Sequence, residues 1–240
     1  MQLELDAFGA FLRVASSPAG DALRIHQIVA IGLNYAEHAR EQKTPLPERP
    51  MVFTKSSAAV ILDGDDIVVP KICQDRPQVD YEGELAVVIG KRARDVTPSR
   101  ALEHVLGYTI ANDVSARWWQ KEGAGKQFYR GKSFDTFCPL LRAITPAARV
   151  PDPQALRLST RLNGETVQDG ATSDMIFDVR TLIAELSRGA TLLPGTVILT
   201  GTPSGVGAAR DPQRFLVEGD VVSIEISGLG VLTNRVRYER

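Results

Sequence analysis

The sequence lacks an excess of charge of either sign. Its 28 lysines and arginines face 29 aspartates and glutamates, which leaves a formal net charge of −1 over 240 residues. It also has no basic stripe with interleaved aromatic residues, the usual footprint of a chain that binds nucleic acid or an anionic membrane. The composition therefore argues against nucleic acid and membrane as partners, and favours a small molecule or another protein.

Cysteine and long apolar runs are also scarce. Cys73 and Cys138 show no CxxC or Cys/His spacing, so both are expected to be reduced structural thiols. No window approaches the ~20 apolar residues of a membrane helix. The N-terminal stretch MQLELDAFGAFLRV has neither a basic start nor a long apolar core, as a secretory signal would. These absences predict a cytoplasmic protein.

What the chain does have is a hydrophobic content of 43%, ample for a core. Short β-rich runs bounded by Gly, Pro, Asn or Asp are typical of strands. Such runs occupy residues 26–33, 65–70, 84–90, 104–113, 156–165, 195–201, 220–228 and 230–238. Gly228-Leu229-Gly230 joins the last two runs as a predicted hairpin, and Asn163-Gly164 predicts a second tight turn.

Helical patterns are fewer. Residues 34–42 predict a short helix, and Thr97 is placed to N-cap a second one to Val105, with Pro98 at its first position. The clearest pattern is 178–188, where apolar residues recur at helical spacing and Gly189 follows as a stop. Strands do not alternate regularly with long helices, so a doubly wound parallel sheet is disfavoured. We expect an α+β fold that is predominantly β.

Two glutamates stand at the head of the most apolar strand, in VDYEGELAVVIGK. Glu82 and Glu84 are two apart and share one face of a strand, and such converging carboxylates are costly to bury without a cation. Asp113, at the end of the next predicted strand, offers a third carboxylate. Oxygen ligands favour Mg²⁺, Mn²⁺ or Ca²⁺. The alternative is that both glutamates face solvent and Asp113 caps a helix that begins at Ser115.

A second group of polar residues lies in GLNYAEHAREQ. On a helix His38 and Glu41 are neighbours at i and i+3, and a carboxylate beside an imidazole orients it as a base. The alternative is an exposed helix whose charges form ion pairs with Arg40. His26 and His104 have no acidic partner at helical spacing and are assigned structural roles.

Six blocks follow one another along the chain: IGLNYAEHA, VDYEGELAVVIGK, YTIANDVSARWWQ, RGKSFDTFCPL, NGETVQDGATSDMIF and TVILTGTPSGVG. In this order they resemble the fumarylacetoacetate hydrolase family, in particular its compact bacterial acylpyruvase-like and 2-hydroxyhepta-2,4-diene-1,7-dioate isomerase-like members. The resemblance covers roughly residues 26–238. It implies a mixed β-sandwich roll with few short helices, a short N-terminal leader at 1–25, a catalytic domain at 26–240 and a homodimer.

The resemblance also implies roles for particular residues. It implies a divalent metal, commonly Mg²⁺, on Glu82, Glu84 and Asp113. It implies a water-activating pair, His38 and Glu41, on a mobile segment, with Lys132 as a further catalytic residue where an oxyanion forms. Arg117, Gln120 and Thr202 match substrate-contacting positions.

The activity implied is hydrolysis of a C–C bond in an acylpyruvate-like 2-oxo or 3-oxo acid, of the fumarylpyruvate or fumarylacetoacetate type. The metal would polarise the substrate and stabilise an enolate. The alternatives on the same platform are 2-hydroxyhepta-2,4-diene-1,7-dioate isomerisation and 2-oxo acid decarboxylation. A noncatalytic metal-binding or ligand-binding module is the alternative from another class.

The chain departs from the family pattern in three places. Lys55 is followed by Ser56 where Lys-Pro is common, and Trp118-Trp119 stands where many relatives have an acidic or smaller residue. The stretch GAGKQFYRGKSF places Gly123, Gly125 and an aromatic residue just before Lys132. These loops are expected to set the substrate. Gly201, Gly205 and Gly207 lack a following helix and a Gly-Lys-Ser/Thr motif, so they predict a turn over the cleft instead of a nucleotide site.

Overall fold

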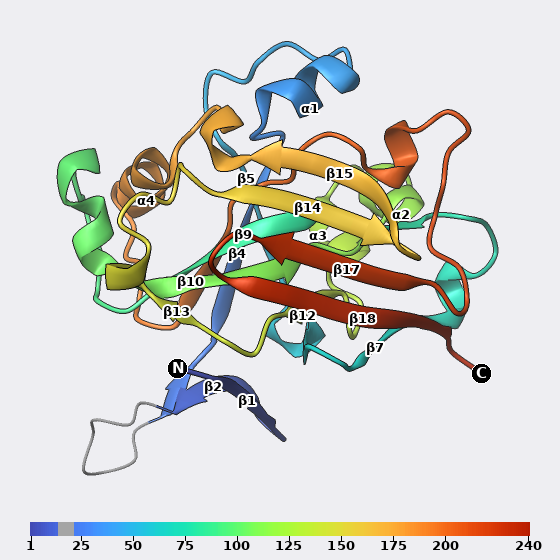
Figure 1. The fold of residues 1–240 in the computed structure, drawn as a ribbon, viewed down its shortest axis with the longest axis horizontal. Helices are drawn as coiled ribbons and strands as arrows, with labels where there is room; N and C mark the ends of the chain where they lie inside the picture. Colours follow the sequence, from blue (N-terminus) through green and yellow to red (C-terminus); the bar gives the residue numbers. More distant parts are fainter. Residues whose placement is uncertain (14–21) are drawn as a thin grey trace.

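The computed structural model describes residues 1–13 and 22–240. It confirms the predicted α+β fold, which is dominated by strands. Two large sheets stack face to face, and the helices lie at their edges (Figure 1). All eight predicted strands are present, with ends shifted by a few residues at most.

The larger sheet has eight strands. In order across the sheet these are β5 (Met51–Lys55), β4 (Gln27–Gly32), β16 (Thr196–Leu199), β9 (Gly83–Ile89), β10 (Val105–Asn112), β12 (Cys138–Leu140) and β6 (Val60–Leu62), with β13 (Thr145–Pro146) also paired to β10. The β16–β4 and β12–β6 pairs are parallel and the other pairs are antiparallel. The sheet is therefore mixed.

The second sheet has five strands, in the order β15 (Glu165–Ala171), β14 (Arg157–Leu162), β17 (Val221–Ile226), β18 (Gly230–Tyr238) and β7 (Asp66–Val69). Both predicted turns are confirmed. Asn163 and Gly164 join β14 to β15 with φ values of 53° and 86°, the left-handed conformations that a two-residue hairpin needs. Residues 227–229 join β17 to β18.

Strand β9 lies at the centre and is covered on both faces. Leu85, Val87 and Ile89 join the core between the two large sheets, and Ala86 and Val88 join a second core on the other face. A strand covered on both sides reads as a continuous apolar run, so the predicted burial of this stretch is confirmed.

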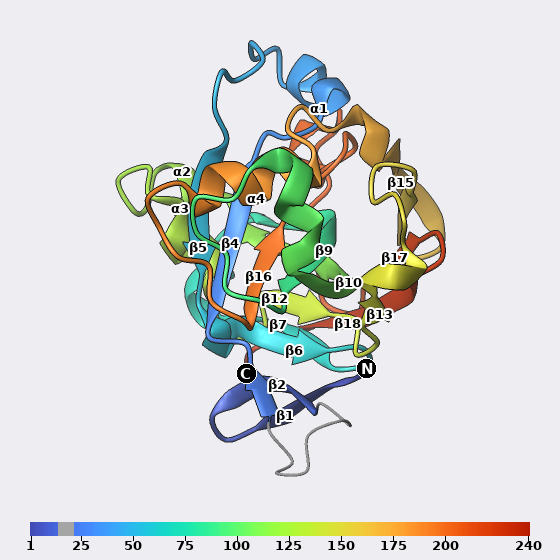
Figure 2. The same cartoon turned by 90° about the vertical axis from the view of Figure 1, so that its left-hand side faces the viewer.

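The second core is closed by a small sheet of β1 (Leu3–Asp6), β2 (Gly9–Arg13) and β3 (Ala22–Arg24). Leu3, Ala10 and Leu12 pack into that core, and Figure 2 shows the sheet below β6. The predicted leader at 1–25 thus contains three strands that the sequence reading missed, and its residues 14–21 lie outside the described part. Strands β8 (Val79–Asp80) and β11 (Ser115–Ala116) form a further pair.

The helices are short. The predictions at 34–42 and 178–188 are confirmed as α1 (Ala36–Glu41) and α4 (Val179–Ser187), and Asp178 caps α4 by accepting from the N–H of Thr181 at 2.7 Å. The predicted helix after Thr97 is a 3₁₀ helix, η3 (Pro98–His104), and the Thr97 side chain does not cap it. Helices α2 (Arg117–Lys121) and α3 (Phe128–Lys132) were missed. Further 3₁₀ turns are η1 (Ser57–Ala59), η2 (Lys71–Cys73), η4 (Ala147–Arg149), η5 (Thr172–Asp174) and η6 (Gly207–Ala209).

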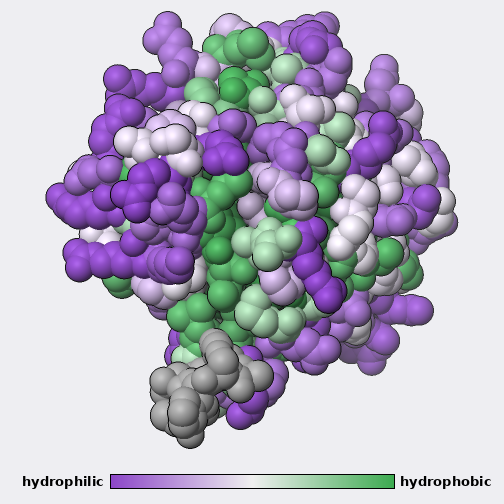
Figure 3. Space-filling view, turned by 60° about the vertical axis from the view of Figure 1, so that its left-hand side comes forward, coloured by the Kyte–Doolittle hydropathy of each residue, from purple (hydrophilic) through white to green (hydrophobic). Residues whose placement is uncertain are grey.

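Both cysteines are buried and free, and burial raises the pKa of the Cys138 thiol to about 12, which suits the predicted structural role. In the described part of the chain, no helix is long and apolar enough to cross a membrane. The face drawn in Figure 3 carries a band of apolar surface between polar flanks.

Candidate active site

The pairing of β9 with β10 assembles the three predicted acidic residues. Ala111 lies opposite Glu84 in this antiparallel register, and the N–H of Asp113 donates to the carbonyl oxygen of Glu82 at 2.9 Å. Opposed residues of an antiparallel pair have Cβ atoms ~4.5–5.5 Å apart. As a result, one carboxylate oxygen each from Glu82, Glu84 and Asp113 lies within 4.8 Å of the other two.

All three carboxylates are buried. The exposed fractions are 7% for Glu82, 1% for Glu84 and 1% for Asp113. The solvent-facing alternative is therefore wrong. Ser115 begins strand β11, not a helix, and the carboxylate of Asp113 is bound by Lys55 and Lys132.

A glycine between the two glutamates lets β9 approach the second sheet. A Cβ on Gly83 would lie 2.4 Å from Oγ1 of Thr160 and 3.1 Å from Cγ2 of Ile224. The N–H of Gly83 donates to Oε1 of Gln168 at 3.0 Å. Because the glutamates point away from this contact, the Glu-Gly-Glu sequence combines close sheet packing on one face with an acidic site on the other.

Two buried lysines neutralise part of the acidic charge. The Nζ of Lys132 lies 2.6 Å from Oε2 of Glu82 and 2.6 Å from Oδ2 of Asp113. The Nζ of Lys55 lies 2.5 Å from the other carboxylate oxygen of Asp113. Burial lowers the pKa of Lys132, but the attraction of Asp113 and Glu82 outweighs it and raises the pKa above its ordinary value. Lys132 therefore holds a positive charge at the centre of the site.

The two glutamates differ sharply in their electrostatic environment. Burial tends to raise the pKa of Glu82, but Lys132 and Arg117 outweigh it and hold the pKa well below its usual range. Burial, followed by repulsion from Asp113 and Glu82, raises the pKa of Glu84 well above its ordinary value. Glu84 accepts from the N–H of Gly201 at 2.7 Å, and within residues 1–13 and 22–240 it forms no ion pair with a lysine or arginine.

The different environments of Glu82 and Glu84 bear on whether these residues fit the divalent metal that the family resemblance implies. Three converging oxygen donors are the set that a hard divalent cation such as Mg²⁺, Mn²⁺ or Ca²⁺ takes. A cation bound to Glu84 would be the positively charged partner that this buried carboxylate needs when it is ionised. The residues therefore fit the group, with Glu82, Glu84 and Asp113 as the side chains that would hold it.

The predicted base lies across the same cavity. The imidazole of His38 is only 4% exposed, so the alternative of a solvated helix face is wrong for this residue. Its Nδ1 lies 2.8 Å from Oε2 of Glu41, and Oε1 of Glu41 accepts from the N–H of Gly205 at 2.8 Å. A carboxylate only accepts, so Nδ1 carries the proton and Nε2 presents a lone pair. The amide nitrogen of Gln42 lies 2.7 Å from Nε2 and covers that lone pair.

Arg117 and Gln120 lie on α2, at the other side of the acidic group. The guanidinium of Arg117 donates twice to Oδ2 of Asp80, at 2.8 and 2.7 Å, and lies 2.7 Å from Oε1 of Glu82. A further N–H of Arg117 donates to Oε1 of Gln120 at 3.2 Å. Charge-assisted bonds of this kind fix the guanidinium plane, and both side chains line the cavity.

Thr202 lies in the cavity wall, but its hydroxyl is already engaged. It donates to the carbonyl oxygen of Gly83 at 2.9 Å and accepts from Nε2 of Gln168 at 2.8 Å. A hydroxyl has one proton, so Thr202 can accept from a ligand but cannot donate to it. Its clear structural effect is to tie the turn after β16 to the strand that carries the glutamates.

The glycine-rich turn after β16 has a role that the sequence reading missed. Its backbone N–H groups bind the carboxylates of three site residues: Gly201 binds Glu84, Gly205 binds Glu41, and Gly207 binds Asp80. Gly205 has φ +103°, and a Cβ there would lie 1.9 Å from the carbonyl oxygen of Val167. The N–H groups of this turn donate to carboxylates of the protein itself. These contacts agree with the prediction of a turn instead of a nucleotide site.

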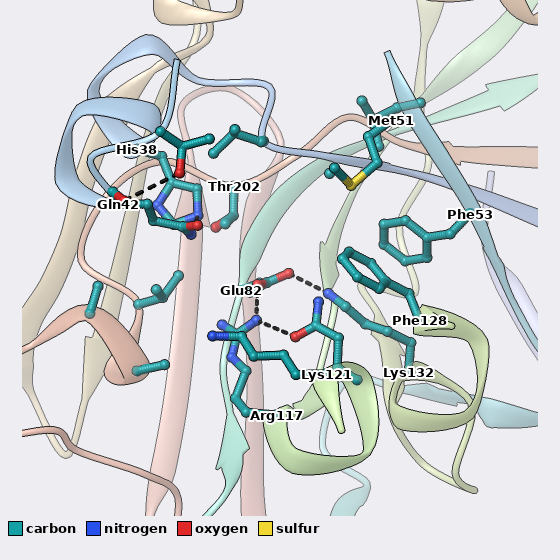
Figure 4. Close-up of a pocket in the computed structure, with 18 of the residues that line it drawn as sticks. His38, Gln42, Met51, Phe53, Glu82, Arg117, Lys121, Phe128, Lys132 and Thr202 are labelled. Atoms are coloured by element: carbon teal, nitrogen blue, oxygen red, sulfur yellow. Dashed lines mark hydrogen bonds and ion pairs between the residues drawn. The ribbon is translucent and has the colours of Figure 1, made fainter. Parts of the chain in front are cut away.

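These residues enclose one cavity of about 410 Å³ (Figure 4). Of the nine predicted site residues, eight line it: His38, Glu41, Glu82, Glu84, Arg117, Gln120, Lys132 and Thr202. Asp113 lies behind Lys132 and Lys55. The sequence reading missed Lys55, Gln42 and Asp80 as parts of the site. Asp80 stands two residues before Glu82 and so shares its strand face, which is the one local signal that points to it.

Comparison with known proteins identifies the family of the chain. The family model "Fumarylacetoacetate (FAA) hydrolase C-terminal" matches residues 27–237. A mitochondrial oxaloacetate tautomerase of Homo sapiens is 46% identical over 213 residues, which are 89% of this chain and 67% of the relative. The oxaloacetate tautomerase YisK of Bacillus subtilis is 46% identical over 87% of this chain and 69% of its own length. The chain thus spans about two thirds of these relatives.

Solved structures give the same result. A fumarylacetoacetate hydrolase from Exiguobacterium antarcticum superposes with a TM-score of 0.82 at 44% identity, over 90% of this chain and 76% of that one. A fumarylpyruvate hydrolase from Pseudomonas aeruginosa, in complex with Mn²⁺ and pyruvate, superposes with a TM-score of 0.82 at 31% identity, over 95% of this chain and 96% of that one. The chain belongs to the fumarylacetoacetate hydrolase family of enzymes.

Proposed function

We propose that the protein catalyses keto–enol tautomerisation of a 2-oxo dicarboxylate of the oxaloacetate class. The observation that carries the proposal is that Glu82, Glu84, Lys132 and the His38–Glu41 pair line one cavity, with the third carboxylate, Asp113, directly behind Lys132. The 46% identity to oxaloacetate tautomerases supports the choice of reaction.

The acidic triad and its neighbours form the end of the site that would hold the 2-oxo acid. When bound, a divalent cation supplies Lewis-acid polarisation of a carboxylate and the adjacent ketone. Lys132 adds a fixed positive charge beside Glu82, where negative charge on the C2 oxygen is stabilised. Arg117 offers a guanidinium N–H and Gln120 an amide to orient a substrate carboxylate.

His38 is the group that moves the proton. In the keto-to-enol direction, Nε2 takes a proton from C3, the C2–C3 double bond forms, and the proton returns to the C2 oxygen. Glu41 holds the ring and stabilises the transient imidazolium. Gln42 must turn away from Nε2 before the lone pair can act. The substrate gains and loses one proton, so the step needs no co-reactant.

The decay of enol-oxaloacetate to its keto form, followed by ultraviolet absorbance, tests the proposal. With Mg²⁺ or Mn²⁺ the wild type is expected to accelerate the decay, and EDTA should remove the acceleration. His38→Ala is expected to lower kcat by about 10²–10⁴, the contribution of a positioned acid–base group. An unchanged kcat in His38→Ala would overturn the assignment of the base.

Hydrolysis of a C–C bond in an acylpyruvate-like acid is the second candidate. It is favoured by the same His38–Glu41 pair, which can draw a proton from water, and by the likeness to a fumarylpyruvate hydrolase. Turnover of acetylpyruvate or fumarylpyruvate in labelled water separates the two reactions. Label in the carboxylate product indicates hydrolysis, whereas a tautomerase leaves the carbon skeleton intact.

The remaining alternatives differ in what is turned over or released. Isomerisation of 2-hydroxyhepta-2,4-diene-1,7-dioate uses the same kind of proton shift, so it is recognised by turnover of that dienedioate itself. Decarboxylation releases CO₂ from oxaloacetate. A noncatalytic module would bind 2-oxo acids without turning any of them over.

We propose in addition that the chain acts as a homodimer, with the apolar band in Figure 3 as a candidate interface. Light scattering after size exclusion gives the mass in solution. A mass of 26.1 kDa would be that of a single chain and would contradict this proposal.

A further inference from the structure

One wall of the cavity is apolar, and the proposed reaction leaves it unused. Met51 and Phe53 from β5 and Phe128 from α3 form this wall (Figure 4). None of these side chains can pair with a carboxylate. A dicarboxylate substrate therefore accounts for the polar side of the cavity only.

This wall lies directly beside the reacting end of the site. The Nζ of Lys132 lies 5.1 Å from the centre of the Phe53 ring, and the same nitrogen is 2.6 Å from Glu82. The rings of Phe53 and Phe128 meet edge to face, with centres 5.3 Å apart and planes at 63°. A group attached close to the 2-oxo end of a substrate would consequently lie against these two rings.

Polar groups for a second carboxylate lie on a different wall. Arg117 and Lys121 line the cavity from α2, away from Phe53 and Phe128 in Figure 4. A carboxylate placed against the two rings would lose its hydration, which is costly, and the cation beside the rings, Lys132, is already paired with Glu82 and Asp113. An aromatic group there would bury apolar area and make edge-to-face contacts.

The size and shape of the cavity allow such a group. Its volume of about 410 Å³ is within the range of pockets that hold drug-sized ligands, ~300–1,000 Å³, and is generous for a four-carbon acid. A Cβ on Gly32 would lie 3.0 Å from the sulfur of Met51, so the glycine makes room for the Met51 side chain. Methionine is flexible and packs well against aromatic rings.

We propose that the cavity has an aromatic subsite, formed by Met51, Phe53 and Phe128, and that the enzyme tautomerises 2-oxo monocarboxylic acids that carry an aromatic ring at or beyond C3. Phenylpyruvate is the simplest such acid that can enolise. The inference rests on the proposed function, because His38 performs the same step: one C3–H bond breaks, one O–H bond forms at C2, and nothing else enters or leaves.

The test compares two substrates on three proteins. The decay of the enol forms of phenylpyruvate and oxaloacetate is measured with Mn²⁺ for the wild type, Phe128→Ala and Tyr129→Ala. Tyr129 is the next residue of α3 and is 51% exposed, so it serves as the matched control. In Phe128→Ala, the ratio of kcat/KM for phenylpyruvate to that for oxaloacetate is expected to fall about tenfold, the effect of losing one aromatic contact and its buried area. Tyr129→Ala should keep the wild-type ratio.

The outcomes separate this inference from the proposed function. Turnover of oxaloacetate without phenylpyruvate, or an equal loss for both substrates in Phe128→Ala, overturns the aromatic subsite and leaves the proposed function standing. Turnover of phenylpyruvate alone supports the subsite and overturns the oxaloacetate assignment.

Binding to the wild type gives a readout that needs neither turnover nor a variant. Benzoylformate keeps the carboxylate and the 2-oxo group, carries a ring and has no C3 hydrogen. Calorimetry with the Mn²⁺-loaded protein is expected to show that it binds at least tenfold more tightly than pyruvate. Equal affinities would overturn the inference.

Discussion

Glu84 is the residue whose substitution tests the electrostatics of the site most sharply. Its pKa is raised well above the ordinary value of 4.5 by burial and by repulsion from Asp113 and Glu82, so the metal-free fold favours the protonated form of this carboxyl. Glutamine reproduces the neutral form and can still accept from Gly201. We therefore expect Glu84→Gln to change the free energy of unfolding of the metal-free protein by no more than about 1 kcal/mol below pH 4.5, where a glutamate is protonated in the folded and in the unfolded protein.

The metal-bound state should respond very differently. A cation at 100 times its Kd stabilises the fold by about 2.7 kcal/mol, which corresponds to a rise in Tm of roughly 5–11 °C for a chain of this size. Glu84→Gln removes one of the three carboxylate ligands, together with the negative charge that the cation would neutralise. The increase in Tm on adding metal should therefore be lost. Glu225→Gln, a substitution of an exposed glutamate on strand β17, is the control that should keep it.

The pH dependence has a definite sign. A group whose pKa is raised on folding contributes stability that is fully present below the unfolded value and is lost as pH rises through the folded value. The metal-free wild type should therefore lose stability as pH rises from 4.5 toward alkaline pH, and Glu84→Gln should lack this loss. Thermal unfolding in EDTA and in MnCl₂ across this range measures both effects. Equal stability of metal-free and metal-bound wild type from neutral to alkaline pH would refute the reasoning.

Three further substitutions test other parts of the site. Glu41→Gln should lower kcat by about 10²-fold while the metal affinity measured by calorimetry stays the same, because only the orientation of His38 is weakened; a changed metal affinity would contradict this. Gly83→Ala should destabilise the fold by about 1–3 kcal/mol in urea unfolding, because its Cβ would lie 2.4 Å from Thr160; an unaffected midpoint would show that the sheets need no close approach there. Arg117→Lys should raise KM more than it lowers kcat, because a lysine cannot replace the planar guanidinium; unchanged kinetics would place Arg117 outside substrate binding.

The sequence predicted those features that depend on local pattern or on the family motifs. The apolar run after Glu84 predicts a strand covered on both faces, and β9 is such a strand. The capped pattern at 178–188 predicts α4. In contrast, α2 and α3 have five residues each, too few to show a helical period. Strand β3 has three residues and carries no recognisable alternation.

Contacts between distant parts of the chain were beyond local pattern. Lys55 lies 58 residues before Asp113, and three strands separate β5 from β10 in the sheet. The two residues meet because the chain passes from β5 directly to β6, which lies on the β10–β12 side of the sheet. The N–H donors of Gly201 and Gly205 have no side-chain signature, because the groups that bind belong to the backbone. These contacts depend on tertiary packing, and no local sequence pattern marks the residues that make them.

The most direct test of the central claim is proton exchange at C3 of the substrate. The wild type with Mg²⁺ in D₂O is expected to introduce deuterium at C3 of oxaloacetate, and proton NMR measures the rate of this exchange. EDTA should abolish the enzymatic exchange, and His38→Ala should lower its rate by about 10²-fold or more. Exchange that is no faster than in buffer with Mg²⁺ alone, or equally fast in His38→Ala, would contradict the account of a metal-assisted proton transfer by His38.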